Sequence, residues 1–385
     1  MKASRIVVVV QELSLTGAPR LTLDILESVQ RESSLRIVSW EGGPLIDAAR
    51  RLGPTVILRR PYLEWALPRR LAGGHLLGVL AGASRRIRSI VQAARLRIWK
   101  PELVYVSSVG ALPLVRMLGL GKVPVVLHVH EMGSALAWAE RSSPGLILSV
   151  PDRYVADSAA VARELVRMGV SPETLTIVPV YPLTAALEMP ASTRADRRIV
   201  TVGGAGNPSW TKGIDLWLLA AREAVDRLGM DRLRFVWVGS RDNETGLQFR
   251  TMVSKLGLDK VVELVPETDR PYDQFARFDV FAMSSWEDSA PLVVLEVMTM
   301  GIPVICFAPT GGPTEEVGEA GVVIPSISPR LMADAIVDLA ESSQRRQALG
   351  SAGAKRVAEQ FTRAASMDAL RKVFDSAIAA RRRRA

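Results

Sequence analysis

The sequence feature that most constrains the fold is a repeated alternation of short apolar runs with helix-length segments. The first run, Ile6–Val10, is continuous and β-branched, which is typical of a strand buried on both faces of a sheet. A glycine turn at 16–19 and an amphipathic stretch at 21–30 follow it. Further runs lie at 36–39, 55–58, 103–106, 123–129 and 153–156. This alternation predicts a parallel α/β sheet.

The pattern lapses between Tyr181 and Asp196, where proline, serine, threonine and charged residues gather, and then resumes. The later apolar runs lie at 198–202, 234–239, 261–265, 280–283, 303–307 and 321–324. A length of 385 residues suits two domains of about 150 residues each. We therefore expect two doubly wound Rossmann-like α/β domains. The expected bounds are 1–184, a linker at 185–197, 198–360, and a C-terminal helix with a basic tail at 361–385.

Composition excludes several classes of protein. Hydrophobic residues make up 48% and charged residues 23% of the chain, which excludes a disordered or fibrous protein. The single cysteine, Cys306, excludes a multi-cysteine metal site, and only three histidines are present. No apolar run approaches the ~18 residues of a membrane span. We expect a cytoplasmic protein, either soluble or peripheral on the inner face of the membrane.

The net charge of +9 is confined to two places. Trp65–Pro101 contains no acidic residue and carries +8, and Arg381–Arg384 add +4, so the remainder carries 9 − 12 = −3. Within the basic segment, Ile87, Ile90, Val91, Ala94 and Ile98 share one helical face. One interpretation is an ordinary surface helix packed on the sheet. The other is contact with an anionic membrane, through Arg85, Arg86, Arg88, Arg95, Arg97 and Arg381.

Two carboxylates follow the strand predicted at 280–283, and a third lies in the next helix. Glu287 and Asp288 fall in the loop at the carboxyl end of that strand, where α/β sheets bind ligands. Glu296 follows in a largely apolar helix, where a carboxylate needs a partner. Ligand hydroxyls are suitable partners. The alternative is a helix capped by Asp288 or Ser289, with Glu296 on a solvated face.

Two glycine turns follow predicted strands, and the one in the second half is a candidate phosphate site. In the second half, glycines at 203–206 follow a strand, and Lys212-Gly213 opens a helix, so that amides and an ammonium group converge. In the first half, Thr16-Gly17 follows the first strand, and the alternative there is a simple turn before Pro19. Tight turns need glycine for backbone reasons, so neither turn is specific by itself.

His128 and His130 end another predicted strand, next to Glu131. Two histidines and a glutamate suggest a metal site, but composition offers hardly any third ligand. A histidine on an apolar strand is more often a hydrogen-bonded core residue. The pair therefore leaves both interpretations open.

Together these motifs resemble the retaining glycosyltransferases of family 4, which have the GT-B fold. The resemblance is carried by Asp288 and Glu296 at their spacing, by the Gly-x-Pro-Val-Ile that follows, and by Lys212-Gly213. It extends strongly over 201–324 and weakly over the first half. It implies two Rossmann-like domains facing a central cleft, a first domain that binds the acceptor, a second that binds the nucleotide sugar, and a terminal helix that crosses back to the first domain.

The resemblance also implies roles for individual residues. Asp288, with Glu287, and His130 would contact the transferred sugar as catalytic groups, and His128 would pack inside. Glu296 would bind the ribose and Lys212 the diphosphate. The family's arginine before the lysine is missing, and Arg241 could take its place. The implied donor-binding residues are Thr16, Gly17, Gly204, Lys212, Gly213, Arg241, Glu296, Gly311 and Gly312.

The implied activity is retaining transfer from a UDP- or GDP-sugar to a glycan or lipid-linked acceptor in cell-envelope polysaccharide synthesis, without a metal or cofactor. A sugar-nucleotide epimerase of the same fold is an alternative, with His130 and Glu131 as its acid–base pair. A polyanion-binding protein is another, although Trp65 and Trp99 are the only aromatics in the basic segment, which disfavours nucleic acid. A dehydrogenase is disfavoured because Gly17 stands alone at the first turn.

Overall fold

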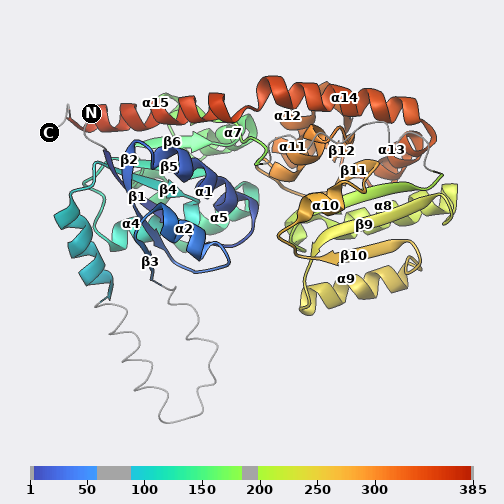
Figure 1. Cartoon of the computed structure of the whole chain (residues 1–385), viewed down its shortest axis with the longest axis horizontal. Helices are drawn as coiled ribbons and strands as arrows, with labels where there is room; N and C mark the ends of the chain where they lie inside the picture. The colour runs from blue at the N-terminus through green and yellow to red at the C-terminus, as the bar shows by residue number, and fades with distance from the viewer. Residues whose placement is uncertain (1–3, 59–87, 184–197, 383–385) are drawn as a thin grey trace, which may run out of the picture. The chain divides into compact units, whose positions relative to one another are not determined.

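The apolar runs form two all-parallel sheets in the computed structural model, which describes residues 4–58, 88–183 and 198–382. The predicted linker at 185–197 and most of the basic segment, including Arg85 and Arg86, lie outside the described residues. The chain divides into two compact units, and Figure 1 shows a parallel sheet with helices in each of them. The GT-B prediction of two parallel α/β domains is confirmed.

Unit 1 comprises Met1–Asp157, Ala162–Val178 and Met367–Ala385, and its seven-stranded sheet has the order β3-β2-β1-β4-β5-β6-β7. β1 pairs with β2 and β4, which buries Val7, Val8 and Val9 completely. The strands are β1 (Ser4–Val10), β2 (Ser33–Ser39), β3 (Thr55–Ile57), β4 (Leu103–Ser107), β5 (Val125–Val129), β6 (Arg153–Ala156) and β7 (Leu175–Ile177). The helices are α1 (Gly17–Val29), α2 (Ile46–Leu52), an unlabelled helix at 88–99, α4 (Leu112–Met117), α5 (Gly133–Ser142), α6 (Leu146–Ser149) and α7 (Ala159–Arg167).

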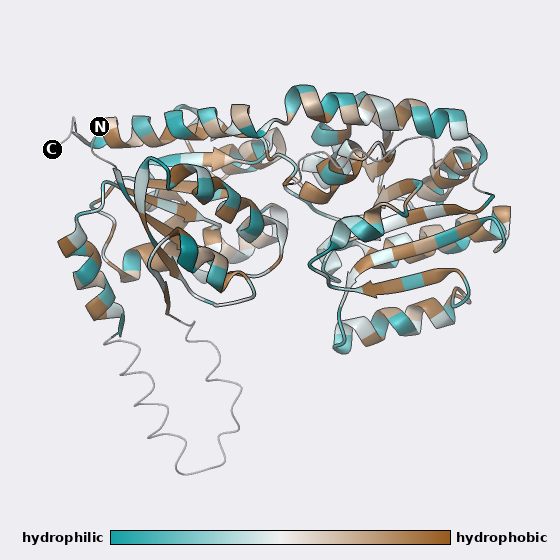
Figure 2. Cartoon of the chain, viewed as in Figure 1, coloured by the Kyte–Doolittle hydropathy of each residue, from teal (hydrophilic) through white to brown (hydrophobic). Residues whose placement is uncertain are grey.

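Unit 2 comprises Ser158–Val161 and Pro179–Ser366, and its six-stranded sheet has the order β10-β9-β8-β11-β12-β13. Its strands are largely hydrophobic in Figure 2, as expected for a sheet whose central strands are covered on both faces. They are β8 (Val200–Ala205), β9 (Leu233–Ser240), β10 (Val262–Pro266), β11 (Val280–Met283), β12 (Val304–Phe307) and β13 (Val322–Ile324). The helices are α8 (Ile214–Leu228), α9 (Glu244–Lys255), α10 (Pro271–Phe275), α11 (Leu292–Thr299), α12 (Gly312–Val317), α13 (Pro329–Glu341) and α14 (Ser343–Gln360), and the two units share α15 (Arg363–Arg382).

α15 begins in unit 2, and its residues from Met367 onward belong to unit 1. There the Phe374 ring packs edge-on against Tyr105 of β4, with 5.3 Å between ring centroids. Leu370 and Val373 are buried in the same unit. The last helix thus completes the core of the first unit.

The glycine cluster at 203–206 does not form the loop that the sequence predicted. Gly203 and Gly204 are residues of β8. A Cβ atom at Gly203 would lie 2.1 Å from the Phe278 ring, and one at Gly204 would lie 2.5 Å from Trp237. These glycines are therefore required by core packing, and the turn begins only at Gly206.

The helix at 88–99 buries the opposite face from the one that its apolar pattern predicts for packing on the sheet. Gln92, Ala93 and Leu96 are buried. Ile90 is 62% exposed and Ile98 is 79% exposed, although both belong to the predicted packing face. Among the described residues, no helix is long and apolar enough to cross a membrane.

Each sheet has one point at which the strand order reverses. In unit 1 this point lies between β1 and β4, and in unit 2 it lies between β8 and β11. The connections that leave two such strands run in opposite directions, which opens a space at their carboxyl ends where α/β proteins bind ligands. The segments that follow β1, β8 and β11 directly carry half of the predicted site residues.

Candidate functional site

In unit 2, Lys212 and Asp288 meet at the switch point. Lys212 follows β8 and Asp288 follows β11, and the Lys212 Nζ lies 2.6 Å from an Asp288 carboxylate oxygen. Ser285 Oγ donates to the same oxygen at 3.2 Å. Both charged residues were predicted from the sequence, but their contact was not. Their ion pair puts an ammonium group at the start of α8.

Glycines shape the backbone around this ion pair. Gly213 caps α8 at φ +58°, and a Cβ atom there would lie 2.0 Å from the Ser284 carbonyl oxygen. Gly311 has φ +109° and forms an isolated parallel bridge with Asp288. The Gly312 amide donates to the Asp288 carbonyl at 2.9 Å, and a Cβ atom there would overlap Ser289. Three of the predicted donor-binding glycines therefore border Lys212 and Asp288.

Glu296 lies inside α11 and is 2% exposed. Its Oε1 accepts a hydrogen bond from the Tyr272 hydroxyl at 2.7 Å. Pro291 is the N-cap of α11 and makes no side-chain capping bond. The alternative with Asp288 or Ser289 as cap and Glu296 on a solvated face is therefore wrong.

Three predicted residues do not take part in the Lys212–Asp288 ion pair. Gly204 contacts tryptophans inside the unit. Arg241, the expected substitute for the missing arginine, bonds Glu267 through its Nε at 3.3 Å. The Glu287 amide lies 3.5 Å from the Thr211 carbonyl, which places Glu287 beside the ion pair but not in it.

Two tryptophans that sequence analysis left without a role frame the same loops. Trp210 precedes Lys212 and Trp286 precedes Asp288. Their rings stack at a centroid separation of 5.8 Å and an interplanar angle of 11°, and Trp210 is 58% exposed. The sequence signal that could have identified them is the presence of one tryptophan in each of the two switch-point loops.

In unit 1, the predicted phosphate turn forms the N-terminus of α1. Thr16 is its N-cap and Gly17 its first residue, and no side chain caps the helix. The Thr16 hydroxyl bonds Ser14 Oγ at 2.8 Å. The simple turn before Pro19 is therefore wrong, because the helix starts two residues earlier and presents its first amides at the carboxyl end of β1.

His130 belongs to a buried network centred on Asp157. Asp157 Oδ2 lies 2.8 Å from His130 Nδ1, and Oδ1 lies 2.8 Å from His128 Nε2. The second nitrogen of each ring is also bonded, to Ser107 Oγ at 3.0 Å for His130 and to the Tyr105 hydroxyl at 2.7 Å for His128. Asp157 was missed in the sequence, although it follows β6 directly and β6 pairs with β5.

The hydrogen-bond chain around Ser107 bears on the protonation of His130. Thr22 uses its single hydroxyl proton to bond the Ala18 carbonyl, so Ser107 must donate to Thr22 across their 2.7 Å contact. Ser107 then has no proton left for His130. His130 Nε2 must therefore carry hydrogen, and Nδ1 must carry another to bond the Asp157 carboxylate. This chain of hydrogen bonds favours the imidazolium form of His130.

The pKa shifts agree with this assignment. Burial acts to lower the pKa of His130, but the Asp157 and Glu131 carboxylates outweigh it and raise that pKa above 6.5. Burial, together with the charge of His130, lowers the pKa of His128. Burial acts to raise the pKa of Asp157, and the two histidines reverse this and lower it. The shifts favour a protonated His130, an ionised Asp157 and a neutral His128.

The expectation that the histidines lack a third metal ligand is wrong. One ligand atom from each of His128, His130 and Asp157 lies within 4.8 Å of the others. All four ring nitrogens are already hydrogen-bonded, so an ion would have to replace those bonds. The described geometry is that of a hydrogen-bonded network.

The two histidines of this network predict that their joint contribution to the stability of unit 1 is greatest near pH 6.5. The contribution of His130, whose pKa is raised on folding, is complete below 6.5 and is lost as the pH rises through the raised value. The contribution of His128, whose pKa is lowered, is lost as the pH falls below 6.5. Urea denaturation from about pH 5 to about pH 9 measures both slopes. In a His130→Gln variant, the decline in stability that His130 causes above pH 6.5 should be lost. An unchanged decline would contradict a protonated His130.

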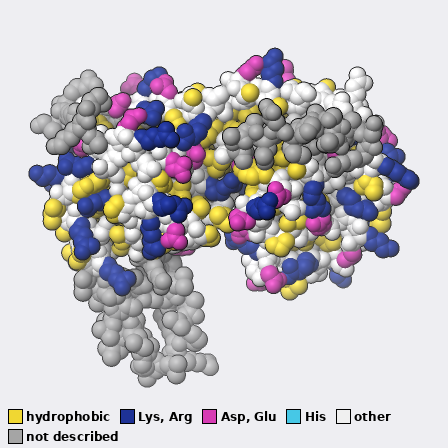
Figure 3. All heavy atoms as spheres, in the orientation of Figure 1, with side chains coloured by type: hydrophobic (Ala, Val, Ile, Leu, Met, Phe, Trp, Pro, Cys, Tyr) yellow, Lys and Arg dark blue, Asp and Glu magenta, His cyan; other side chains and the backbone are white. Residues whose placement is uncertain are grey.

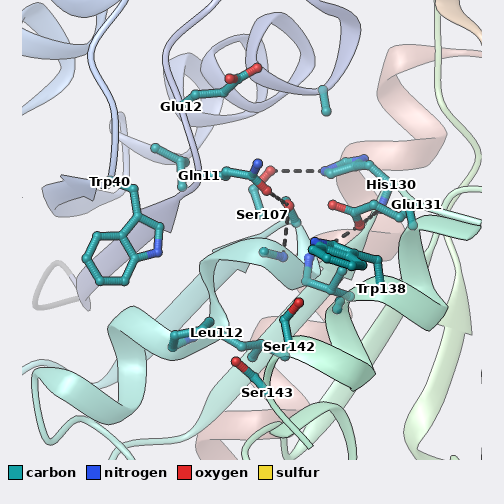
Figure 4. Close-up of a pocket in the computed structure, with 18 of the residues that line it drawn as sticks. Gln11, Glu12, Trp40, Ser107, Leu112, His130, Glu131, Trp138, Ser142 and Ser143 are labelled. Atoms are coloured by element: carbon teal, nitrogen blue, oxygen red, sulfur yellow. Dashed lines mark hydrogen bonds between the residues drawn. The ribbon is translucent and has the colours of Figure 1, made fainter. Parts of the chain in front are cut away.

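A pocket of about 920 Å³ opens in unit 1 beside this network (Figure 4). His130 and Glu131 line it, together with Gln11 and Ser107 from the ends of β1 and β4. Glu131 Oε2 accepts from the His130 and Val109 amides at 3.0 and 3.3 Å, and burial raises its pKa. The pocket thus occupies the switch point of the first sheet.

Comparison with known families and proteins matches both halves of the chain. A family model described as "Glycosyl transferases group 1" matches residues 196–342, and one described as "Glycosyltransferase Family 4" matches residues 30–180. A D-inositol 3-phosphate glycosyltransferase of Thermobispora bispora is 29% identical over 361 residues, covering 85% of this chain and 82% of that protein. The enzyme of that name from Kineococcus radiotolerans is 28% identical, covering 66% and 67%.

Solved structures share the fold at low sequence identity. Anabaena HepE in complex with UDP and glucose superposes with a TM-score of 0.77 at 16% identity, covering 97% of this chain and 100% of that one. WaaG, a glycosyltransferase involved in lipopolysaccharide biosynthesis, superposes with a TM-score of 0.69 at 14% identity, covering 95% and 98%. Both superpositions extend over almost the whole chain.

Proposed function

Because this chain belongs to the group 1 glycosyltransferases of family 4, we propose that it transfers a sugar, with retention of anomeric configuration, from a UDP- or GDP-sugar to a hydroxyl of a glycan or lipid-linked acceptor. Unit 2 is proposed to bind the nucleotide sugar and unit 1 the acceptor. The observation that carries the donor assignment is the contact of Lys212 with Asp288 at the switch point of the second sheet.

The proposed role of Lys212 follows from charge. When the glycosidic bond to the diphosphate breaks, negative charge develops on the leaving phosphates. The Lys212 ammonium and the amides at the start of α8 are positioned to stabilise that charge. Without a donor, Asp288 neutralises the ammonium. In the proposed mechanism the diphosphate takes over Lys212, and the Asp288 carboxylate becomes available to the sugar.

Glu296 is proposed to bind the ribose. It is a carboxylate held by Tyr272 within an apolar helix, and ribose hydroxyls suit its acceptor oxygens. The stacked Trp210–Trp286 pair borders the same loops. HepE, which shares the fold, was solved with UDP and UDP-glucose, which supports a uridine nucleotide as the first donor to test.

Nucleotide titration tests the proposal. Calorimetry of the full chain with UDP, GDP, NAD and a short oligonucleotide should give binding to UDP or GDP alone. Binding to NAD or to the oligonucleotide instead would favour a dehydrogenase or a polyanion-binding protein. On the face displayed in Figure 3, the described basic and acidic side chains are interspersed.

Transfer is expected to survive chelation of divalent metals. The proposed charge stabilisation uses Lys212, backbone amides and the dipole of α8. Sugar transfer measured with and without EDTA should therefore agree within about twofold. Loss of activity in EDTA that magnesium or manganese restores would contradict this, and would direct attention to His128, His130 and Asp157.

We also propose that the chain works at the cytoplasmic face of the membrane in cell-envelope polysaccharide synthesis. The support is the helix at 88–99, where Ile90 and Ile98 are exposed beside Arg88 and Arg95. Apolar side chains among arginines suit insertion at an anionic lipid surface. WaaG, of the same fold, is named for lipopolysaccharide biosynthesis.

Membrane attachment is expected to depend on salt and on this helix. The chain should sediment with liposomes containing phosphatidylglycerol at low salt and be released at high salt. Arg88→Gln/Arg95→Gln should weaken binding about thirtyfold, at ~1 kcal/mol for each arginine. The matched control, Arg167→Gln/Arg330→Gln, removes two exposed arginines elsewhere. Equal binding to neutral liposomes, or equal loss in the control, would contradict the proposal.

A further inference from the structure

The pocket of unit 1 has two chemically different walls. A polar wall is formed by Gln11, Ser107, Ser108, His130 and Glu131. An apolar wall comes mainly from α4, α5 and α6 and from the residue after β2. Its members are Trp40, Leu112, Pro113, Met117, Ala135, Trp138, Ala139, Leu146 and Ile147. Figure 4 shows Trp40 and Trp138 on opposite sides of Gln11 and Ser107.

The apolar wall is open to a ligand. Trp138 is 68% exposed and Met117 is 41% exposed, although both line the pocket. Exposed tryptophan and methionine at a concave site are typical of surfaces that gain binding energy by covering apolar area. A ligand that contacted only the polar wall would leave both side chains in water.

The charges that line the pocket do not suit an anionic ligand. Among the described lining residues are three carboxylates, Glu12, Glu41 and Glu131, and no lysine or arginine. The one cation, His130, already bonds the Asp157 carboxylate. Phosphate groups are bound by arginine, lysine or a free helix N-terminus. Of these, the described lining offers only the N-terminus of α1, at Thr16 and Ala18, and a phosphate there would share the pocket with the three carboxylates.

We infer that this pocket binds an uncharged amphiphilic acceptor, in which a hydroxyl-bearing sugar reaches Glu131 and an attached alkyl or aryl group lies along Trp138 and Met117. The inference rests on the proposed function, whose acceptor it specifies. It separates this chain from a phosphate-bearing acceptor such as the compound in its relatives' name, D-inositol 3-phosphate.

Binding of three probes to the full chain tests the inference. These are octyl β-glucoside below its micelle concentration, methyl β-glucoside, which lacks the alkyl group, and D-inositol 3-phosphate. By calorimetry, octyl glucoside should bind at least about tenfold more tightly than methyl glucoside, and inositol phosphate should be the weakest. Equal binding of the two glucosides, or tightest binding of inositol phosphate, would overturn the inference.

Variants locate the site. Trp138→Ala should weaken the binding of octyl glucoside about fivefold or more and should change the affinity for methyl glucoside less. Leu148→Ala removes a 46% exposed apolar side chain of α6 that does not line the pocket, and it should leave both affinities unchanged. Circular dichroism should confirm that both variants are folded. An equal effect of the two variants would show nonspecific detergent binding and overturn the inference.

Titration with UDP in the same samples separates this inference from the proposed function. If UDP binds and octyl glucoside does not, the acceptor chemistry is wrong and the glycosyltransferase proposal stands. If octyl glucoside binds with the expected preference and none of the nucleotides binds, the proposed donor site is wrong. The two failures therefore give different results.

Discussion

Asp157→Ala should lower the free energy of unfolding of unit 1 by about 3–5 kcal/mol, the cost of leaving a buried charge without its partner. The Asp157 side chain is 3% exposed and compensates His130, whose side chain is 4% exposed. Its removal also leaves the His128 Nε2–H without its acceptor. Urea denaturation at about pH 6.5 measures the loss, because the contribution of Asp157 is complete well above its ordinary pKa of 3.8.

Two further variants make this result interpretable. Asp157→Asn keeps an oxygen acceptor but not the charge, so its loss should be smaller than that of alanine yet clearly measurable. Asp242→Ala removes an aspartate whose side chain is 97% exposed and should change stability by less than ~0.5 kcal/mol. A loss for Asp157→Ala as small as that of the surface control would show that His130 is neutral in the folded chain.

Lys212→Ala should weaken UDP or GDP binding by about ten- to a hundredfold, which corresponds to ~1.5–3 kcal/mol for a charge-assisted contact. Affinity for the free nucleoside should change much less, because the lost contact is to the phosphates. Calorimetry with the nucleoside and the diphosphate measures both. This pattern differs from a general loss of folding, which would weaken both ligands together.

The matched control is Lys255→Ala, which removes an exposed lysine at the end of α9. It should leave both affinities unchanged. If Lys212→Ala binds the diphosphate as well as the unchanged chain does, the Lys212–Asp288 pair is a structural contact and the phosphates lie elsewhere.

The strands could be predicted from sequence because buried parallel strands require continuous apolar runs. β1 and β11 lie where Ile6–Val10 and the run at 280–283 placed them. The motif after β11 was informative because its apolar pattern predicts a buried helix. A carboxylate such as Glu296 within that helix then implies a partner. The sequence could not name that partner, Tyr272, because 24 residues and another strand separate the two.

The predictions from sequence were wrong where one residue type can serve two physical purposes. Gly203 and Gly204 have the composition of a phosphate loop, but they serve the close approach of Phe278 and Trp237 to a strand. Periodicity showed that Ile90 and Ile98 share a face of their helix, but it could not show which face meets the sheet. Asp157 carries no local signal at all. Its importance depends on the pairing of β5 with β6, which places it beside two histidines.

The course of α15 has a consequence for the order in which the molecule is made. Phe374 and its neighbours cover Tyr105 only after every residue of unit 2 has been synthesised. Between residue 178 and Ala377 the ribosome adds 199 residues, which takes about 10–40 s at ~5–20 residues per second. During that interval the apolar surface around Tyr105 remains uncovered and open to chaperones, while most of unit 2 emerges as one continuous segment. The unit synthesised first is therefore the one that finishes folding last.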